Sequence, residues 1–160
     1  MPNTANTPQS PPYTVENYRQ EESIGFLLHQ AKLRLTQALD ERIGDLDITT
    51  AQWTVLKQIA LRNGETASTL CKCMGCDTGS MTRMIDRLEE KALIRRERST
   101  TDRRVVLLHV TDTGKALLPL LVPRVVDMLN QALRDFTPEE IVLTKQLISR
   151  IVTNLDKRND

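Results

Sequence analysis

Aromatic side chains are scarce in this chain of 160 residues: one Trp, two Tyr and two Phe make up 3% of it. A core must therefore be built mainly from Leu, Ile, Val and Met. The chain also lacks any run of 18 uninterrupted apolar residues, which predicts that no segment spans a membrane. No basic segment followed by an apolar run stands near the first residue, so we expect no secretory signal. These absences favour a soluble, cytoplasmic, globular protein.

Cysteine is also scarce, and the three cysteines, Cys71, Cys73 and Cys76, fall within six positions. The thiols of a cytoplasmic protein stay reduced, so a disulfide framework is not expected. On a helix Cys71 and Cys73 would point about 200° apart, because each residue turns the helix by about 100°. A closed zinc site needs four ligands, and both His29 and His109 are distant in sequence. We therefore predict no metal site and no cofactor.

Redox sensing by thiols stays open as an alternative. Cys76 stands near the start of a predicted helix, a position that lowers the pKa of a thiol. Cys73 and Cys76 are therefore candidate redox residues. Inert, half-buried thiols are the competing interpretation.

Enzyme motifs are missing as well. The sequence has no GxSxG, HExxH or GxxxxGK[ST] pattern, and no cluster of His, Asp and Ser that would pair a nucleophile with a base. We therefore expect no catalytic residue and a function based on binding.

Positive and negative charges balance over the whole chain, but they are unevenly distributed along the sequence. The formal net charge is +1, from 22 Lys and Arg against 21 Asp and Glu. Residues 78–104 carry five acidic residues against eight basic ones: Arg83, Arg87, Lys91, Arg95, Arg96, Arg98, Arg103 and Arg104. A local basic stripe on a balanced chain indicates a phosphate-facing surface. A solvated charged face is the alternative.

The chain begins with a segment that is rich in proline. Residues 1–15 are predicted to form a flexible tail, since the first twelve hold four prolines and no charge. Apolar positions at helical spacing then predict a long first helix from Ser23 to near Gly44. A second helix, capped at Thr49, is expected to stop near Asn63-Gly64.

Two short helices, Thr66–Met74 and about Thr78–Lys91, are predicted next. Between them, Gly75 can adopt the left-handed conformation that closes the first helix, and Asp77 is suited to cap the second. Cys71 is the small residue expected where the two helices cross. This arrangement predicts a helix-turn-helix.

The second of these helices has distinct inner and outer faces. Its inward stripe is Met81, Met84 and Leu88. Short hydroxyl groups and guanidinium groups lie outward, and they suit base-edge and phosphate contacts in a major groove. The outward contact residues are Thr78, Ser80, Thr82, Arg83 and Arg87.

The apolar period then changes to that of strands. Leu93–Arg98 and Val105–Val110 are short segments with β-branched residues, and the polar, cationic residues 99–104 join them. Helix, glycine turn, helix and basic-tipped hairpin follow one another in the order of a winged helix-turn-helix. This order favours DNA binding over an ordinary helical hairpin. The predicted wing contacts are Asp102, Arg103 and Arg104.

The rest of the chain is predicted to be helical. Thr111 is expected to cap a long helix that bends at Pro119 and Pro123, because each proline removes a backbone donor. Thr137-Pro138-Glu139-Glu140 combines an N-cap, a proline at the first helical position and a capping-box glutamate. It therefore begins the last helix.

Four ordered motifs resemble the MarR family of bacterial winged-helix regulators. They are Thr49-Thr50-Ala51-Gln52-Trp53, residues 82–91 (TRMIDRLEEK), Asp102-Arg103-Arg104 and Val110-Thr111-Asp112-Thr113-Gly114. The resemblance extends over roughly residues 24–118. The chain departs from the family pattern at Ala92, where a glycine is usual, and at the two prolines in the long helix.

The resemblance implies a homodimer with interdigitated terminal helices on a pseudo-palindromic operator, with one recognition helix and one wing per half-site. It also implies that Arg104 enters the minor groove, braced by Asp102. A narrow minor groove concentrates negative potential and attracts arginine. Family members bind small aromatic or phenolic anions between the dimerisation helices and the winged domain. To this crevice we assign Phe26, His29, Gln30 and Trp53.

The sequence thus predicts a mainly α fold with a small β-hairpin wing. Residues 47–111 are expected to form the winged helix-turn-helix DNA-binding domain, and residues 16–46 and 112–160 the helical dimerisation region. The expected function is that of a dimeric, sequence-specific transcriptional regulator, a repressor released by a small aromatic or phenolic ligand. A cysteine-based redox-sensing regulator is the alternative.

Overall fold

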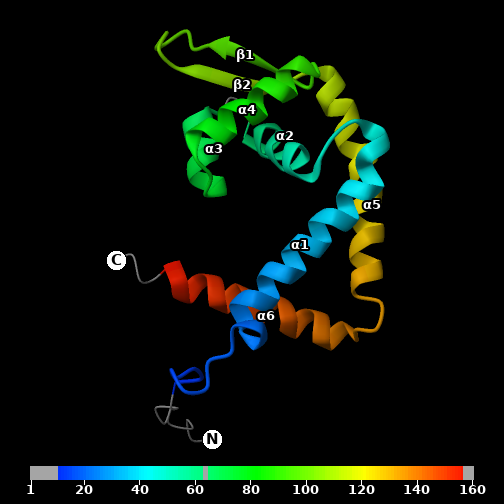
Figure 1. Cartoon of the computed structure of the whole chain (residues 1–160). Helices are drawn as coiled ribbons and strands as arrows, with labels where there is room; N and C mark the ends of the chain where they lie inside the picture. Colours follow the sequence, from blue (N-terminus) through cyan, green and yellow to red (C-terminus); the bar gives the residue numbers. More distant parts are fainter. Residues whose placement is uncertain (1–10, 63–64, 157–160) are drawn as a thin grey trace, which may run out of the picture.

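The computed structural model describes residues 11–62 and 65–156. Within these ranges the predicted mainly α fold with a two-stranded wing is confirmed (Figure 1). The elements are α1 (Ile24–Ile43), α2 (Thr50–Arg62), α3 (Ala67–Met74), α4 (Thr78–Glu90), β1 (Ile94–Arg98), β2 (Val106–Val110), α5 (Asp112–Ala132) and α6 (Pro138–Asp156). Most of the predicted tail, and the predicted stop of the second helix at residues 63–64, lie outside the described residues.

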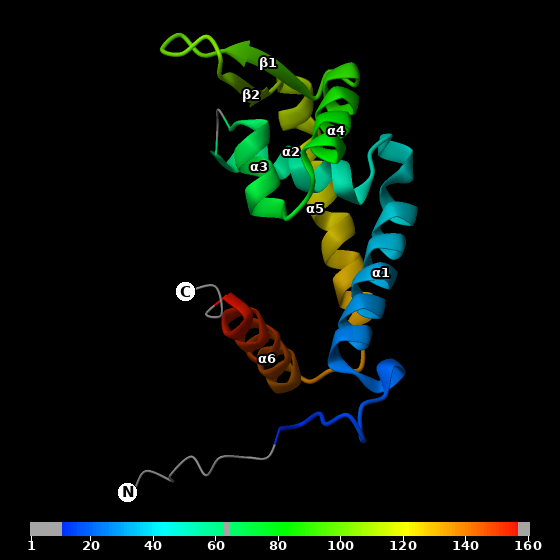
Figure 2. The same ribbon diagram turned by 60° about the vertical axis from the view of Figure 1, so that its left-hand side comes forward.

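The elements form a compact unit and a pair of long helices that extend from it. α2, α3 and α4 gather next to the β1–β2 hairpin, while α1 and α5 run side by side away from this unit (Figures 1 and 2). α6 follows α5 and extends away from the far end of this pair (Figure 2). No helix of the described ranges is long and apolar enough to cross a membrane.

Short polar residues begin the helices, as the sequence predicts. The Thr49 hydroxyl accepts a hydrogen bond from the Gln52 N–H at 3.2 Å, and the Gln52 side chain accepts one from the Thr49 N–H at 3.1 Å. Thr137 and Glu140 form the same reciprocal pair at the start of α6. Each pair satisfies backbone donors that the helix itself leaves free. Single side-chain caps begin four further helices: Ser23, Thr66, Asp77 and Thr111.

One apolar core joins the long helices to the compact unit. Leu39 and Ile43 of α1 and Leu121 of α5 are buried in the same cluster as Leu56 of α2 and Leu88 of α4. Polar contacts strengthen this junction on the surface. The Arg124 guanidinium of α5 pairs with the Asp45 carboxylate at 2.8 Å, between α1 and α2, and thereby lowers the pKa of Asp45.

The turn from α4 to β1 contains Ala92, the departure from the family pattern noted above. Its φ of 53° lies in the left-handed region. The Ala92 N–H donates to the Glu89 carbonyl at 2.8 Å, and the Ala92 carbonyl accepts from the Thr111 hydroxyl at 2.6 Å. The turn therefore forms without a glycine, with its backbone held from both sides.

Replacing Ala92 with glycine is expected to stabilise the protein. A left-handed alanine costs about 1–2 kcal/mol, whereas glycine adds unfolded-state entropy of about 0.5–1 kcal/mol. The net gain of about 0.5–1 kcal/mol should raise the midpoint of thermal unfolding by roughly 1–4 °C in calorimetry. Gly75→Ala is the opposite control, because φ is 61° there and nothing lies within 4 Å of an added Cβ. A midpoint of thermal unfolding that is lower for Ala92→Gly than for the unaltered protein would show that the left-handed backbone of Ala92 is not strained.

The long helix α5 runs through both of its prolines. Pro119 and Pro123 are exposed, and the helix is continuous from Asp112 to Ala132. Each proline leaves the carbonyl four residues earlier without its helical donor, and the residues that carry these carbonyls, Lys115 and Pro119, are exposed. The bend expected at these positions stays a prediction.

Candidate nucleic-acid interface

The helix-turn-helix begins with a tight turn between α3 and α4. Gly75 is left-handed at φ 61°, and the Cys76 N–H donates to the Cys71 carbonyl at 3.3 Å. The Asp77 carboxylate then accepts from the Ser80 N–H at 2.9 Å. Hydrogen bonds from the Ser80 side chain and N–H hold the pKa of Asp77 below its usual range. The predicted turn and cap are both confirmed, and they fix where the recognition helix α4 starts.

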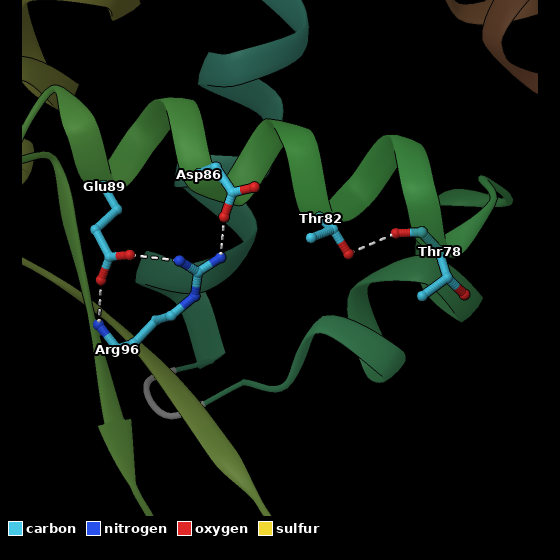
Figure 3. A network of polar contacts seen from close by, with 5 residues as sticks. All are labelled: Thr78, Thr82, Asp86, Glu89 and Arg96. Carbon is cyan, nitrogen blue, oxygen red and sulfur yellow. Dashed lines mark hydrogen bonds and ion pairs between the residues drawn. The ribbon is translucent and has the colours of Figure 1, made fainter.

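The inner and outer faces of α4 are separated as predicted, and the inner face includes one residue, Ile85, that was not predicted. Met81 and Leu88 are buried, but Ile85 is also buried while Met84 is only half-buried. The helical spacing of 81, 85 and 88 is the signal that identifies Ile85. All five predicted contact residues are exposed: Thr78, Ser80, Thr82, Arg83 and Arg87. The Thr82 hydroxyl donates to the Thr78 carbonyl at 2.8 Å (Figure 3).

The tip of the wing is an ordered turn. The Ser99 N–H donates to the Val105 carbonyl at 2.9 Å, and the Val105 N–H donates to the Asp102 carbonyl at 2.9 Å. The Asp102 carboxylate accepts from the Arg104 N–H, also at 2.9 Å. These bonds hold the backbone on which the guanidinium groups of Arg103 and Arg104 are presented.

The structure shows Asp102 bonded to the backbone of Arg104, and the expected brace to the Arg104 guanidinium in the minor groove stays a prediction. Among the contacts of the described residues, the Asp102 carboxylate reaches the backbone N–H of Arg104 and no contact joins it to the guanidinium. The reason is local: an aspartate readily bonds the backbone N–H two residues later in a turn. Asp102 therefore shapes the wing backbone, and the Arg104 side chain is not tied to it.

Internal ion pairs divide the eight basic residues of the stripe into two groups. Lys91 binds Asp47, with its ammonium 2.9 Å from the carboxylate. Arg95 pairs with Glu97, and Arg96 pairs with two carboxylates of α4. The other five are exposed, and in the described part of the chain their side chains have neither an ion pair nor a hydrogen bond: Arg83, Arg87, Arg98, Arg103 and Arg104. The available cations thus lie on α4 and at the wing tip.

The four residues assigned to a ligand crevice lie on α1 and α2. Phe26 and Gln30 are half-buried and His29 is exposed, all on the first turns of α1. Trp53 packs half-buried against the core, and the Lys57 ammonium lies 5.4 Å from its ring centre. These positions do not identify a common ligand cavity.

A different hollow, of about 700 Å³, opens between α1, α5 and α6. Apolar side chains, among them Leu35, Met128 and Ile148, line it together with Arg34 and Gln131. Sequence reasoning missed this hollow, because its lining comes from three helices that only the fold brings together.

The three thiols differ in exposure. Cys73 is exposed, whereas Cys71 and Cys76 are half-buried. Burial and, next, the neighbouring Cys71 raise the pKa of the Cys76 thiol. The expected lowering of this pKa is therefore wrong, because desolvation outweighs any effect of the helix start. A higher pKa leaves less thiolate for oxidation at Cys76. Among the described residues, no three His, Cys, Asp or Glu side chains group together as metal ligands.

Two helices at a tight turn, followed by a basic-tipped hairpin, define a winged helix-turn-helix protein of the DNA-binding regulator class. The family model described as "MarR family" matches residues 48–106. The chain is 32% identical over 130 residues to the multiple antibiotic resistance protein MarR of Escherichia coli (strain K12), covering 81% of this chain and 90% of that protein. The protein therefore belongs to the MarR family.

Solved structures agree with this membership. A mutant E. coli MarR complexed with operator DNA superposes with a TM-score of 0.75, at 30% identity, covering 79% of this chain and 91% of that one. Bordetella bronchiseptica BpsR, whose DNA binding is described as regulated by 6-hydroxynicotinic acid, superposes with a TM-score of 0.76, at 26% identity, covering 84% of this chain and 96% of that one.

Proposed function

We propose that the protein is a dimeric, sequence-specific transcriptional regulator, a repressor released from a pseudo-palindromic operator by a small aromatic or phenolic ligand. The observation that carries DNA binding is the placement of the five unpaired arginines on α4 and the wing tip. Arginine at a major groove and arginine at a minor groove read different features of the same site. The operator complex of E. coli MarR supports this assignment.

The proposed contacts divide between the two elements. Residues of α4 enter the major groove and read base edges or bind phosphate, and residues of the wing reach the adjacent minor groove. The α4 contacts are Thr78, Ser80, Thr82, Arg83 and Arg87. The wing contacts are Arg103 and Arg104, with Asp102 holding the turn.

Dimerisation is proposed from the unpartnered apolar faces of the long helices. α6 has no buried residue within Pro138–Asp156. Exposed apolar patches larger than a few hundred Å² are unusual on monomers and mark interaction sites. Large apolar side chains are exposed on all three helices: Ile24, Leu27 and Leu33 on α1, Val122, Val126 and Leu129 on α5, and Val142, Leu143, Leu147 and Val152 on α6. A second copy would cover them and pair the two recognition helices.

Light scattering at micromolar concentration is therefore expected to give twice the mass of one chain. Leu143→Glu places a charge on the exposed apolar face of α6 and should shift the protein toward a single chain. Thr100→Glu, at the exposed wing tip, is the control and should leave the mass unchanged. The mass of one chain for the unaltered protein would contradict dimerisation.

Arg83→Ala is expected to weaken operator binding by about 1–3 kcal/mol if Arg83 reads a base edge. Fluorescence anisotropy would compare DNA from upstream of the protein's own gene with a random duplex at one salt concentration. Lys91→Ala is the control, because Lys91 is already paired with Asp47 and should change both affinities little and equally. Equal losses on both duplexes for Arg83→Ala would show that Arg83 binds phosphate alone.

The ligand response is proposed from the hollow between α1, α5 and α6. Its volume of about 700 Å³ lies in the range of small-molecule sites, and its mixture of apolar residues with Arg34 suits an aromatic anion. The regulation described for BpsR supports a response of this kind. Phe26, His29, Gln30 and Trp53 stay a separate prediction for the crevice beside the winged domain.

A further inference from the structure

We infer that Arg96 is a positioning residue, which holds the wing against the recognition helix and does not itself bind DNA. This inference rests on the proposed function. Arg96 belongs to the basic stripe, so charge alone would count it among the phosphate contacts. The contacts of its side chain and backbone indicate otherwise.

Arg96 lies on β1 directly beside α4. Its guanidinium is 2.6 Å from the Asp86 carboxylate and also bonds the Glu89 carboxylate. Asp86 and Glu89 are three positions apart and therefore share one face of α4. Figure 3 shows both carboxylates on the side of the helix that faces the strand, with Arg96 between them. We refer to Arg96, Asp86 and Glu89 as the clamp.

The clamp also includes the backbone of the strand. Arg96 pairs with Leu108 in the hairpin register, but the N–H groups of both residues bond outside the β1–β2 ladder. The Leu108 N–H donates to the Glu65 carbonyl at 2.8 Å, and the Arg96 N–H donates to the Glu89 carboxylate at 3.1 Å. This is the non-hydrogen-bonded type of antiparallel pair. Glu89 thus satisfies an edge-strand donor while it binds the side chain of the same residue.

The charges of the clamp oppose a phosphate contact. Two carboxylates face one guanidinium, and hydrogen bonding to Asp86 and attraction to Glu89 raise the pKa of Arg96. A DNA phosphate approaching Arg96 would meet net negative charge. Arg98, two residues along the same strand, has no such partner in the described part of the chain.

The position of the clamp is the reason why we expect it to affect DNA binding. α4 carries Arg83 and Arg87, whereas the wing tip carries Arg103 and Arg104, and both elements must meet DNA at once. Because the clamp already holds α4 and the wing together, less conformational entropy is lost in ordering the wing when DNA binds. Random DNA, bound mainly through charge, depends less on this geometry than the operator does.

The decisive test compares two adjacent glutamates. Glu89→Ala and Glu90→Ala remove the same charge from the same helix, but Glu90 is exposed and forms no ion pair among the described residues. Charge attraction alone predicts that both variants bind DNA more tightly. The clamp predicts that Glu90→Ala binds as tightly as the unaltered protein or more so, and that Glu89→Ala binds the operator about tenfold more weakly. Tighter operator binding by both variants would overturn the inference.

A salt series on Arg96→Met and Arg103→Met separates the clamp from a phosphate contact, since Arg103 is one of the proposed wing contacts. Loss of one phosphate contact reduces the magnitude of the negative slope of log affinity against log salt by about one, which is expected for Arg103→Met and not for Arg96→Met. The double variant Glu89→Ala/Arg96→Met should bind the operator no more weakly than the weaker single variant, because both changes break the same contact. A slope reduced in magnitude by about one in Arg96→Met would overturn the inference.

Hydrogen exchange measured by NMR tests the clamp without DNA. The Arg96 amide should exchange faster in Glu89→Ala than in the unaltered protein and remain unchanged in Glu90→Ala, with circular dichroism confirming that both variants are folded. An unchanged Arg96 amide in Glu89→Ala would overturn the inference. If the unaltered protein binds operator and random DNA equally, the proposed function fails, while the exchange measurement still decides whether the clamp exists.

Discussion

Gly114→Ala is expected to destabilise the protein by about 3 kcal/mol, toward the upper end for overpacking, and to lower the midpoint of thermal unfolding by roughly 6–12 °C. An ideal Cβ at this position would lie 2.2 Å from the Leu93 carbonyl oxygen and 2.7 Å from a Val110 methyl group. Backbone atoms cannot rotate away as a flexible side chain can, so the first turn of α5 would have to move.

Movement of that turn would disturb the base of the wing. Thr111 caps α5 through the Gly114 N–H at 3.1 Å, and its own N–H donates to the Leu93 carbonyl at 3.1 Å. The same few atoms therefore join the end of α4, the first strand and the start of α5. We expect Gly114→Ala to lose operator binding together with stability.

Calorimetry of Gly114→Ala beside Gly44→Ala tests this expectation. Gly44 has helical dihedral angles, and nothing lies within 4 Å of an added Cβ. Alanine should be neutral or slightly stabilising at Gly44, because it lowers the entropy of the unfolded chain. Equal midpoints for Gly114→Ala and the unaltered protein would show that α5 docks against Leu93 less closely than the structure describes.

Signals that act over a few residues were sufficient to predict the helices and the turn of the DNA-binding unit. An N-cap such as Asp77 bonds the backbone three residues later, and Gly75 sets a single left-handed position. Such contacts depend on neighbouring residues, which the sequence displays directly.

The division of the basic stripe was not predictable, because its ion pairs join residues that are far apart along the chain. Lys91 reaches Asp47, 44 positions earlier, and Arg96 reaches Asp86, 10 positions earlier. Counting charges in a window treats Arg96 and Arg98 as equivalent, whereas only the fold places carboxylates beside one of them. The rise in the pKa of Cys76 has a similar origin, since burial depends on packing.

Arg104→Ala is expected to weaken operator binding by about 1–3 kcal/mol. Its guanidinium has no partner in the described part of the chain, so it is available to a narrow minor groove, where negative potential is concentrated. Arg104→Lys keeps the charge but loses the planar group with its fixed donors. It should bind more weakly than the unaltered protein and more tightly than Arg104→Ala in anisotropy titrations.

Two variants of Asp102 then determine whether the shape of the wing contributes beyond its charge. Asp102→Asn removes the negative charge but keeps an oxygen that can accept from the Arg104 N–H, whereas Asp102→Ala removes both. Charge attraction alone predicts that both variants bind the operator more tightly, and by the same amount. If the turn positions Arg104, Asp102→Asn should bind the operator at least as tightly as the unaltered protein. Asp102→Ala should then lose about 0.5–1.5 kcal/mol of binding free energy, because it lacks the hydrogen bond. Equal, tighter binding by both variants over a salt series would reduce the wing to a charged loop and remove the argument for Arg104 in the minor groove.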